Sequence, residues 1–309
     1  MQHKKAVNII GWIIATLTTL LYTFTQYPTI SFWDGAEFAT TSTTLQISHP
    51  PGAPFFQLLG SILPIAYISP LFSGLSVMML YYICVYVLSR FSQMYPGIIT
   101  SSIIGALTFA VLDSQWFCAN ETDVYPLSLL LSLLSIWLTI KWTQTHRVNY
   151  LILICLILGL SLCVHQLTLL SLPAICLIIY FDKRKTNFKG ALLYLFISLL
   201  LIVLIQFLLP IFLIWILSEY AILKIIIFSL ILAFLIVVAY KKSKPILLYT
   251  ILGIIFLIIG LSIYLIIPIR SNAGVPLNQY SPNTANQFKN YYNRENFTKP
   301  PLVYGQYYT

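Results

Sequence analysis

Charged residues are scarce in this chain. They make up 8% of its 309 residues, whereas hydrophobic residues make up 59% and the mean hydropathy is +0.88. A soluble globular domain needs roughly 25% charged residues to keep its surface in water. The composition therefore excludes a soluble domain and indicates a protein embedded in a membrane.

The apolar runs also lack alternating polar residues. They extend over about 20 residues, enough for a helix to cross the ~30 Å hydrocarbon core of a bilayer. A membrane β-barrel needs shorter segments of about 10 residues that alternate between apolar and polar side chains. We therefore predict an all-α, polytopic helical membrane protein.

The five cysteines lack the spacing of a metal site. Four lie inside apolar runs and are interpreted as small core residues, and Cys118 lies in a predicted loop without an obvious partner. The first residues, MQHKKAVNIIGW, have the basic start of a signal peptide, but no small-residue cleavage site follows. We expect an uncleaved first span with a cytoplasmic N-terminus.

We predict about nine membrane spans from the long apolar runs. They are Val7–Phe24, Pro70–Leu88, Gly97–Leu112, Val124–Ile140, Tyr150–Val164, Leu167–Phe181, Ala191–Leu217, Ala221–Tyr240 and Ile246–Ile267. Basic clusters flank the fifth and sixth spans together, and positive loops stay in the cytoplasm. These two short spans are therefore expected to form a hairpin that turns near His165.

Basic residues fall mainly on the side that this arrangement makes cytoplasmic. They are Lys4, Lys5, Arg90, Lys141, Arg147, Lys183, Arg184, Lys185, Lys189, Lys241, Lys242 and Lys244, whereas Lys224, Arg270, Lys289, Arg294 and Lys299 fall elsewhere. The acidic residues lie on the opposite side, except for Asp182. The net charge of +9 thus follows from membrane orientation and does not indicate a nucleic-acid partner.

Three predicted extracytoplasmic segments carry most of the remaining polar residues. They are a long first loop, 25–69, with SFWDGAEFATT and HPPGAPFF; a second loop, 113–123; and a tail, 270–309, rich in Asn, Tyr and Pro. Residues 1–269 are expected to form the transmembrane domain. The tail has too few aliphatic residues for a core of its own, so it either packs on that domain or stays loose.

Asp34 and Glu37 are the most conspicuous acids, because they are three residues apart in a chain with few carboxylates. On a helix they would share a face, with Cβ atoms about 5–6 Å apart. Repulsion at that distance raises the proton affinity of one carboxylate, which can tune a general base toward working pH. The alternative is a pair of loop carboxylates without a catalytic role.

Other polar groups lie at the external ends of the predicted spans. They are His49, Asp113, Gln115, Glu121, Asp123, His165, Gln166 and Arg270. Ionisable groups near membrane depth are costly and usually mark a site. A guanidinium at Arg270 suits a phosphate group, and the alternative is a side chain that reaches the membrane interface without binding anything.

Four stretches together resemble the DUF2723 family of bacterial and eukaryotic membrane proteins. They are FWDGAEF, HPPGAPFFQLLG, DSQWFCANETDVYPL and PIRS, and the resemblance runs from about Pro28 to the C-terminus. The chain departs from the family pattern in two places. Gly35 comes one position early, before Ala36 and Glu37, and Asp123 stands where the family has glutamate.

The resemblance implies a GT-C-like fold and sugar transfer from a polyprenyl-phosphate carrier on the extracytoplasmic face. The acceptor would be a protein or glycan hydroxyl, and the sugar mannose. By position, the resemblance implies that Asp34 is the general base and that Glu37 supports it or exchanges roles with it. His49, Pro51 and Gly52 would shape the loop, Glu121 and Asp123 would line the opposite wall, Arg270 would hold the phosphate, and Trp33, Tyr125 and His165 would contact substrate.

No cofactor is expected, because the phosphate ester is already activated, and a divalent metal ion is left open. Members of the family are longer, so a partner chain supplying a C-terminal part is an expectation. The expected location is the bacterial inner membrane. The alternatives are a lipid-carrier flippase or transporter, which needs a polar path to the bilayer midplane, and a non-catalytic, truncated membrane protein.

Overall fold

The computed structural model describes residues 2–27, 29, 33–182, 186–295 and 297, and no strand forms among them. The basic cluster of Lys183, Arg184 and Lys185 lies outside the described residues, as do residues 298–309 of the tail. The described part of the chain is helical, as the sequence predicted.

Each predicted span coincides with an apolar helix. These helices are α1 (Gln2–Phe24), α4 (Ile68–Leu88), α5 (Tyr95–Ala110), α7 (Tyr125–Thr145), α8 (Val148–Leu162), α9 (Leu172–Phe181), α10 (Phe188–Leu217), α11 (Ala221–Lys241) and α12 (Pro245–Leu261). Among the described residues, six helices are long and apolar enough to cross a membrane. A seventh span results if α5 and α6 (Asp113–Asn120), bent by 62° at their junction, count as one. The chain is thus a multi-pass membrane protein, and about nine spans remains a prediction.

Proline residues lie at the start of four of these helices and of a short helix at residues 54–62, because the first helical positions need no backbone N–H donor. They are Pro54, Pro96, Pro126, Pro173 and Pro245. The prolines therefore indicate in the sequence where the preceding loops end and these helices begin.

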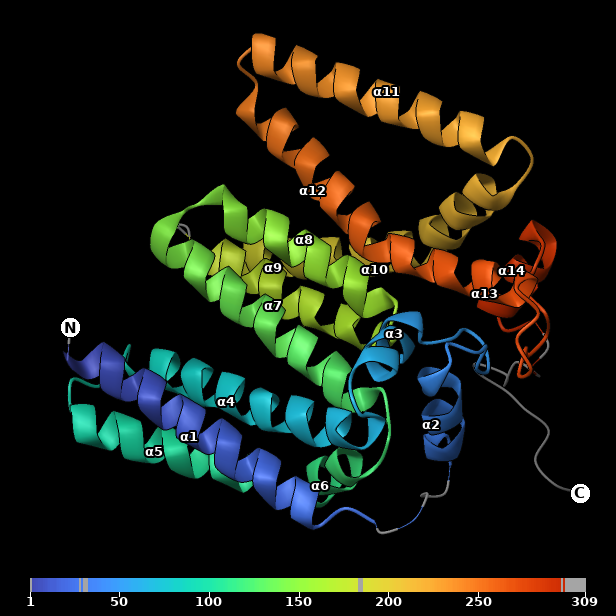
Figure 1. Ribbon diagram of the computed structural model, residues 1–309. Helices are drawn as coiled ribbons and strands as arrows, with labels where there is room; N and C mark the ends of the chain where they lie inside the picture. Colours follow the sequence, from blue (N-terminus) through green and yellow to red (C-terminus); the bar gives the residue numbers. More distant parts are fainter. Residues whose placement is uncertain (1, 28, 30–32, 183–185, 296, 298–309) are drawn as a thin grey trace, which may run out of the picture.

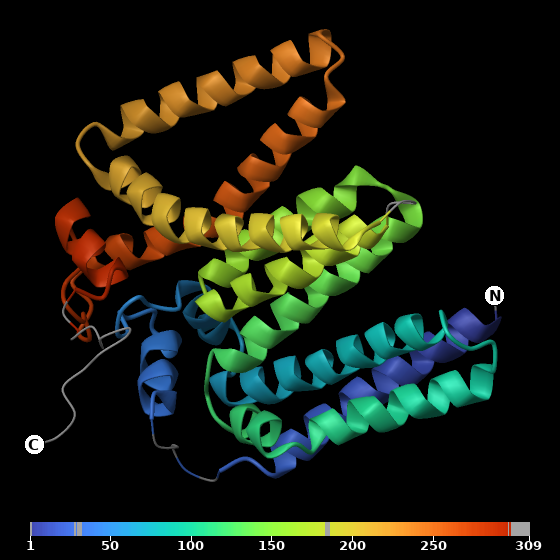
Figure 2. The same cartoon turned by 180° about the vertical axis from the view of Figure 1, so that it is seen from behind.

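The long helices lie side by side in layers (Figure 1; Figure 2). Helices α1, α4 and α5 form one layer, and α7, α8 and α9 pack beside it, with α4 against α7. Helix α10 follows α9, and α11 lies at the outer edge with almost its whole surface exposed. This exposed apolar surface is the kind that faces lipid in a membrane.

The short helices gather at one end of the molecule. They are α2 (Gly35–Thr43), α3 (Pro54–Ile62), α6, α13 (Ile266–Asn272) and α14 (Ala285–Tyr292), with the 3₁₀ turns η1 (Ile65–Tyr67), η2 (Gln166–Ser171) and η3 (Ser262–Leu265). The N-terminus and the α4–α5 and α7–α8 connections lie at the opposite end (Figure 1). The segments predicted to be extracytoplasmic therefore meet in space, although they are far apart in the sequence.

The tail segment packs on the membrane domain as far as it is described. Helix α14 contacts α10 and buries Phe288, Tyr291 and Tyr292. The rings of Tyr292 and Tyr264 lie 5.3 Å apart, so α14 adds to a core shared with the last long helix. These aromatic side chains compensate for the missing aliphatic residues.

Helices α8 and α12 approach closely through two glycines. A Cβ atom on Gly159 would lie 2.2 Å from the Leu257 carbonyl oxygen, and one on Gly260 would lie 2.5 Å from the Leu156 carbonyl oxygen. Small residues at such crossings let backbones pack in contact, which drives helix association in membranes. This contact places the end of α12, which η3 and α13 follow in the chain, beside the end of α8.

The variant Gly159→Ala should destabilise the protein by roughly 1–3 kcal/mol, because the methyl group overpacks the crossing. The matched control is Gly105→Ala in α5, where the nearest atom, Cys84 Sγ, is 4.0 Å from the added Cβ. Thermal unfolding in detergent should show a lower midpoint for Gly159→Ala alone. Equal midpoints in both variants would contradict the close α8–α12 crossing.

Cysteine labelling tests the predicted orientation. Thr43 and Asn286 are exposed at the end that carries the short helices, and Thr186 is exposed in the α9–α10 connection. A membrane-impermeant maleimide should label Thr43→Cys and Asn286→Cys in intact cells above the wild-type background. Thr186→Cys should react only after the membrane is permeabilised, and its labelling in intact cells would overturn the orientation.

Candidate functional site

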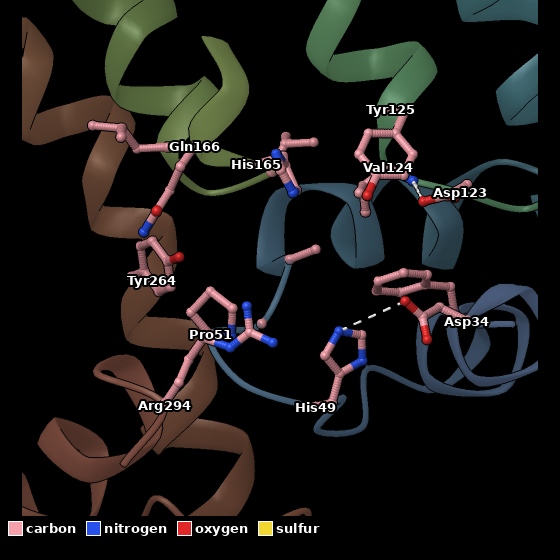
Figure 3. A pocket seen from close by; sticks show the side chains of 15 residues that line it. Asp34, His49, Pro51, Asp123, Val124, Tyr125, His165, Gln166, Tyr264 and Arg294 are labelled. Carbon is pink, nitrogen blue, oxygen red and sulfur yellow. Dashed lines mark hydrogen bonds and ion pairs between the residues drawn. The ribbon is translucent and has the colours of Figure 1, made fainter. Parts of the chain in front are cut away.

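A cavity of about 270 Å³ opens among the short helices. Its lining comes from segments that are distant in the sequence, as Figure 3 shows. The lining residues are Asp34, Phe38, His49, Pro51, Gly52, Ala53, Asp123, Val124, Tyr125, Leu162, Val164, His165, Gln166, Tyr264 and Arg294. The lining combines charged side chains with apolar ones, a mixture that is found in many small-molecule sites.

A tight turn presents His49 and Pro51 to this cavity. The His49 carbonyl oxygen accepts a hydrogen bond from the Gly52 N–H at 2.9 Å, and the Pro50–Pro51 peptide bond is cis, which defines a type VI turn. Gly52 has φ 81°, and a Cβ atom there would lie 2.7 Å from Tyr291 Oη. Both its backbone conformation and its close contact with α14 therefore require glycine.

His49 lies between the carboxylates of Asp34 and Glu37. Its Nδ1 is 3.0 Å from Glu37 Oε2, and its Nε2 is 3.9 Å from Asp34 Oδ2. The hydrogen bond from the imidazole to Glu37 raises the pKa of His49, and burial of the ring opposes this effect. Asp34 and Glu37 thus meet through the imidazole between them.

Glu37 is oriented by several donors. Glu37 Oε1 accepts hydrogen bonds from the His49 backbone N–H and from Gln279 Nε2, the latter at 2.9 Å. Asp34 precedes the first residue of α2, makes no side-chain capping bond and keeps 59% of its side chain exposed. Asp34 is therefore the carboxylate available to a ligand, and Glu37 is the one that positions His49.

Asp123 faces the cavity from the segment before α7. Its Oδ1 accepts a hydrogen bond from the Val124 N–H at 2.5 Å, and its backbone is tied to Ser69. Burial, with smaller contributions from the charges of Asp34 and Glu121, raises the pKa of Asp123 to about 6. This carboxyl group can therefore exchange a proton near neutral pH.

His165 closes the cavity on the side of η2. Its Nδ1 accepts a hydrogen bond from the Leu167 N–H at 3.1 Å, which assigns the proton of the neutral ring to Nε2. Burial and the charge of Arg294 lower its pKa. The centre of the Tyr125 ring lies 5.1 Å from that of the imidazole. The two residues that were predicted to contact substrate therefore lie side by side.

The two arginines at this end differ in what they bind. Arg270 Nε donates to the Leu45 carbonyl oxygen at 2.8 Å, and Nη2 donates to the Thr44 carbonyl oxygen at 2.9 Å. Arg270 thus holds the C-terminus of α2 and does not line the cavity. Arg294 does line it, and its guanidinium extends toward Pro51 (Figure 3).

Most of the predicted site residues are brought together. Asp34, His49, Pro51, Gly52, Asp123, Tyr125 and His165 line the cavity, and Glu37 contacts it through His49. Trp33 is 83% exposed and Glu121 is 5% exposed, and neither lines the cavity. The sequence prediction omitted Tyr264 and Arg294 from the site. Like Arg270, Arg294 is a cation on the predicted extracytoplasmic side, where cations are rare.

Asp34, Glu37 and His49 also form a group that could hold a metal ion, because one ligand atom from each lies within 4.8 Å of the others. Glu37 Oε2 and His49 Nδ1 are already paired with each other. A metal ion would therefore use Asp34 and His49 Nε2, with the bond to Glu37 orienting the imidazole as carboxylates do in metal sites.

Comparison with known protein families gives a match over residues 34–188. They match the family model described as the protein O-mannosyl-transferase TMEM260 N-terminal domain. The chain belongs to this family. No solved structure matches the chain.

The part that matches the TMEM260 N-terminal domain begins at Asp34 and ends at the start of α10. It includes the acids and histidines of the cavity. Tyr264 and Arg294 lie outside it, so the site combines the matched region with the segment after α10.

The variant His49→Gln tests the contact between the imidazole and its carboxylates. Because the folded-state pKa of His49 is raised above its ordinary value of about 6.5, its stabilisation is fully present below that pH. The stabilisation is lost as the pH rises through the raised pKa. The difference in melting temperature between wild type and His49→Gln should therefore be larger near pH 6 than near pH 8.5.

Glu37→Gln serves as the comparison for this experiment, because it removes the main cause of the raised pKa of His49. In that background the His49→Gln difference should vary much less with pH. A difference that stays constant with pH in the wild-type background would show that His49 is held by its packing alone.

Proposed function

We propose that this chain is a membrane glycosyltransferase of the extracytoplasmic face. It moves a sugar, with mannose the first choice, from a polyprenyl-phosphate carrier to an acceptor hydroxyl of a protein or glycan. The observation that carries this proposal is the meeting of Asp34, His49 and Asp123, from three separate segments, in one cavity. Membership of an O-mannosyltransferase family supports sugar transfer as the reaction.

The proposed reaction is a single inverting displacement. The acceptor oxygen attacks the anomeric carbon of the sugar, the bond from that carbon to the phosphate oxygen breaks, and the polyprenyl phosphate leaves as the anion. Asp34 takes the proton of the acceptor hydroxyl, because it is the exposed carboxylate at the cavity. Glu37 keeps His49 in the orientation that contacts Asp34.

The cavity offers a cation for the leaving phosphate. Arg294 supplies a guanidinium at the lining, and guanidinium groups bind phosphate oxygens strongly. Arg270 is engaged by two backbone carbonyl groups. We therefore assign the carrier phosphate to Arg294 in preference to Arg270.

Finer features are part of the same proposal. They are a GT-C-like fold, membership of the DUF2723 family, a bacterial inner-membrane location with a cytoplasmic N-terminus, and a partner chain that adds a C-terminal part. The gathering of acids, histidines and Arg294 at one end of the helices supports an extracytoplasmic site over a transport path through the midplane.

The variant Asp34→Asn tests the assignment of the base. With purified protein, polyprenyl-phosphate mannose and serine/threonine peptides, transfer should fall about 10²–10⁴-fold, the usual contribution of a general base. Asp113→Asn is the matched control, since Asp113 is an exposed carboxylate at the same end that does not line the cavity.

Radiolabelled mannose in the peptide fraction measures the transfer. Asp113→Asn should keep the wild-type rate. Wild-type transfer by Asp34→Asn would refute Asp34 as the base. Absence of transfer from every polyprenyl-phosphate sugar, with folded wild-type protein, would refute the proposed function.

A further inference from the structure

Tyr264 contributes a buried hydroxyl group to the cavity, and the proposed reaction gives this group no role. Tyr264 lies in η3, directly after α12, and only 1% of its surface is exposed, yet it lines the cavity that contains Asp34. Figure 3 shows its hydroxyl oxygen on the side of the ring that faces the cavity. The hydroxyl group is therefore enclosed by protein and accessible to a ligand in the cavity.

The Tyr264 hydroxyl has no hydrogen-bonding partner among the residues that the structure describes. Nearby polar side chains are engaged, since Gln166 Oε1 accepts from Gln206 Nε2 at 3.1 Å and Tyr291 Oη donates to the Ser48 carbonyl oxygen at 2.7 Å. Buried hydroxyl groups are normally hydrogen-bonded, because an unpaired one loses the bonds that water made with it. The unpaired donor at Tyr264 thus indicates a partner that occupies the cavity.

The ring of Tyr264 is held in place by two aromatic side chains of α14. The ring centres of Tyr264 and Tyr292 lie 5.3 Å apart with 64° between the ring planes, and those of Tyr264 and Phe288 lie 6.4 Å apart with 79° between the planes. Such edge-on contacts are favourable for aromatic pairs. The hydroxyl is therefore fixed before a ligand enters, which lowers the entropy cost of binding.

The wall around Tyr264 is otherwise apolar where the end of α8 meets η3. Cys163 Sγ lies 3.5 Å from the Leu261 carbonyl oxygen, so residues 162–164 lie beside the start of η3. Leu162 and Val164 line the cavity together with Tyr264. This part of the wall combines apolar side chains with one neutral hydroxyl, which suits a sugar ring, because a sugar presents C–H groups and uncharged hydroxyl groups together.

The carboxyl groups of the cavity lie across from this wall. Figure 3 shows Tyr264 on one side of the cavity and Asp34 and Asp123 on the other. The volume of about 270 Å³ is just below the roughly 300–1,000 Å³ of sites that hold drug-sized ligands. The space therefore suits a single sugar ring between Tyr264 and the carboxyl groups.

We propose that Tyr264 is a specificity-determining residue of this site, with its Oη donating a hydrogen bond to one hydroxyl oxygen of the transferred sugar. The sugar ring then lies between Tyr264 and the carboxyl group of Asp34, with C–H groups against Leu162 and Val164. This inference rests on the proposed function, because it assigns a position to the sugar of that reaction. It places a binding residue outside residues 34–188, the part that matches the family model.

The variant Tyr264→Phe removes only the hydroxyl group. With polyprenyl-phosphate mannose as donor, kcat/KM for transfer should fall roughly 3–10-fold, the loss expected for one neutral hydrogen bond. Donors that each lack one mannose hydroxyl identify the partner. With the donor that lacks the bonded hydroxyl, Tyr264→Phe should equal the wild type, because the bond is absent from both proteins.

Tyr81→Phe is the matched control. The Tyr81 hydroxyl is also buried without a partner within the described part of the chain, but it lies in α4 and does not line the cavity. Tyr81→Phe should keep the wild-type kcat/KM with every donor, and thermal unfolding confirms that both variants are folded. An equal loss by Tyr264→Phe with all donors, or no loss with any, would show that its hydroxyl does not bind the sugar and would overturn the proposal.

Binding to the full chain in nanodiscs separates this inference from the reaction. Tyr264→Phe should weaken binding of polyprenyl-phosphate mannose roughly 3–10-fold and leave binding of sugar-free polyprenyl phosphate unchanged. That pattern, without transfer by the wild type, would support the role of Tyr264 and refute the proposed reaction. Transfer by the wild type, with equal effects of Tyr264→Phe on both ligands or none on either, would overturn the role of Tyr264 while the glycosyltransferase stands.

Discussion

Hydrogen bonds between the first loop and the segment after α12 hold the site in place. Tyr291 donates to the Ser48 carbonyl oxygen at 2.7 Å, and the Ile47 N–H donates to the Leu277 carbonyl oxygen at 2.9 Å. Arg270 binds the carbonyl groups at the end of α2. Helix α2 is only nine residues long, too short to be stable by itself in water. Its position, and with it the position of Asp34, therefore depends on these contacts from the far end of the chain.

The electrostatics of the site follow from this enclosure. Folding brings the carboxyl groups of Asp34 and Asp123 to one cavity and removes much of the water around Asp123, which raises its pKa. Across the same space, the imidazole of His49 is held by Glu37, and Arg294 supplies the positive charge. A small cavity thus contains carboxyl and imidazole groups beside a guanidinium, the combination that the proposed sugar transfer from a phosphate ester uses.

Much of the site could be predicted because its residues stand out from an apolar background. Asp34, Glu37 and Asp123 are costly in such a chain, and the HPPG turn around His49 has a recognisable pattern. Arg270 and Arg294 carried equal signals, since both are cations on the predicted external side. Which of the two arginines belongs to the site depends on whether its guanidinium contacts backbone carbonyl groups or lines the cavity. No local pattern in the sequence determines this. Tyr264 was omitted because an aromatic residue inside an apolar run resembles any core residue.

The sequence by itself determined the helical membrane class, the positions of the long helices and the collection of polar loops on one side. These features depend on local apolar length and on charge asymmetry, which are properties of short segments. Only the tertiary structure decided that His49 separates Asp34 from Glu37, that Arg270 supports α2, and that Arg294 lines the cavity. These outcomes depend on contacts between segments more than 200 residues apart in some cases, such as Arg270 and Leu45. Such contacts form only when the whole chain packs, because a close-packed interior leaves each side chain few positions that fit.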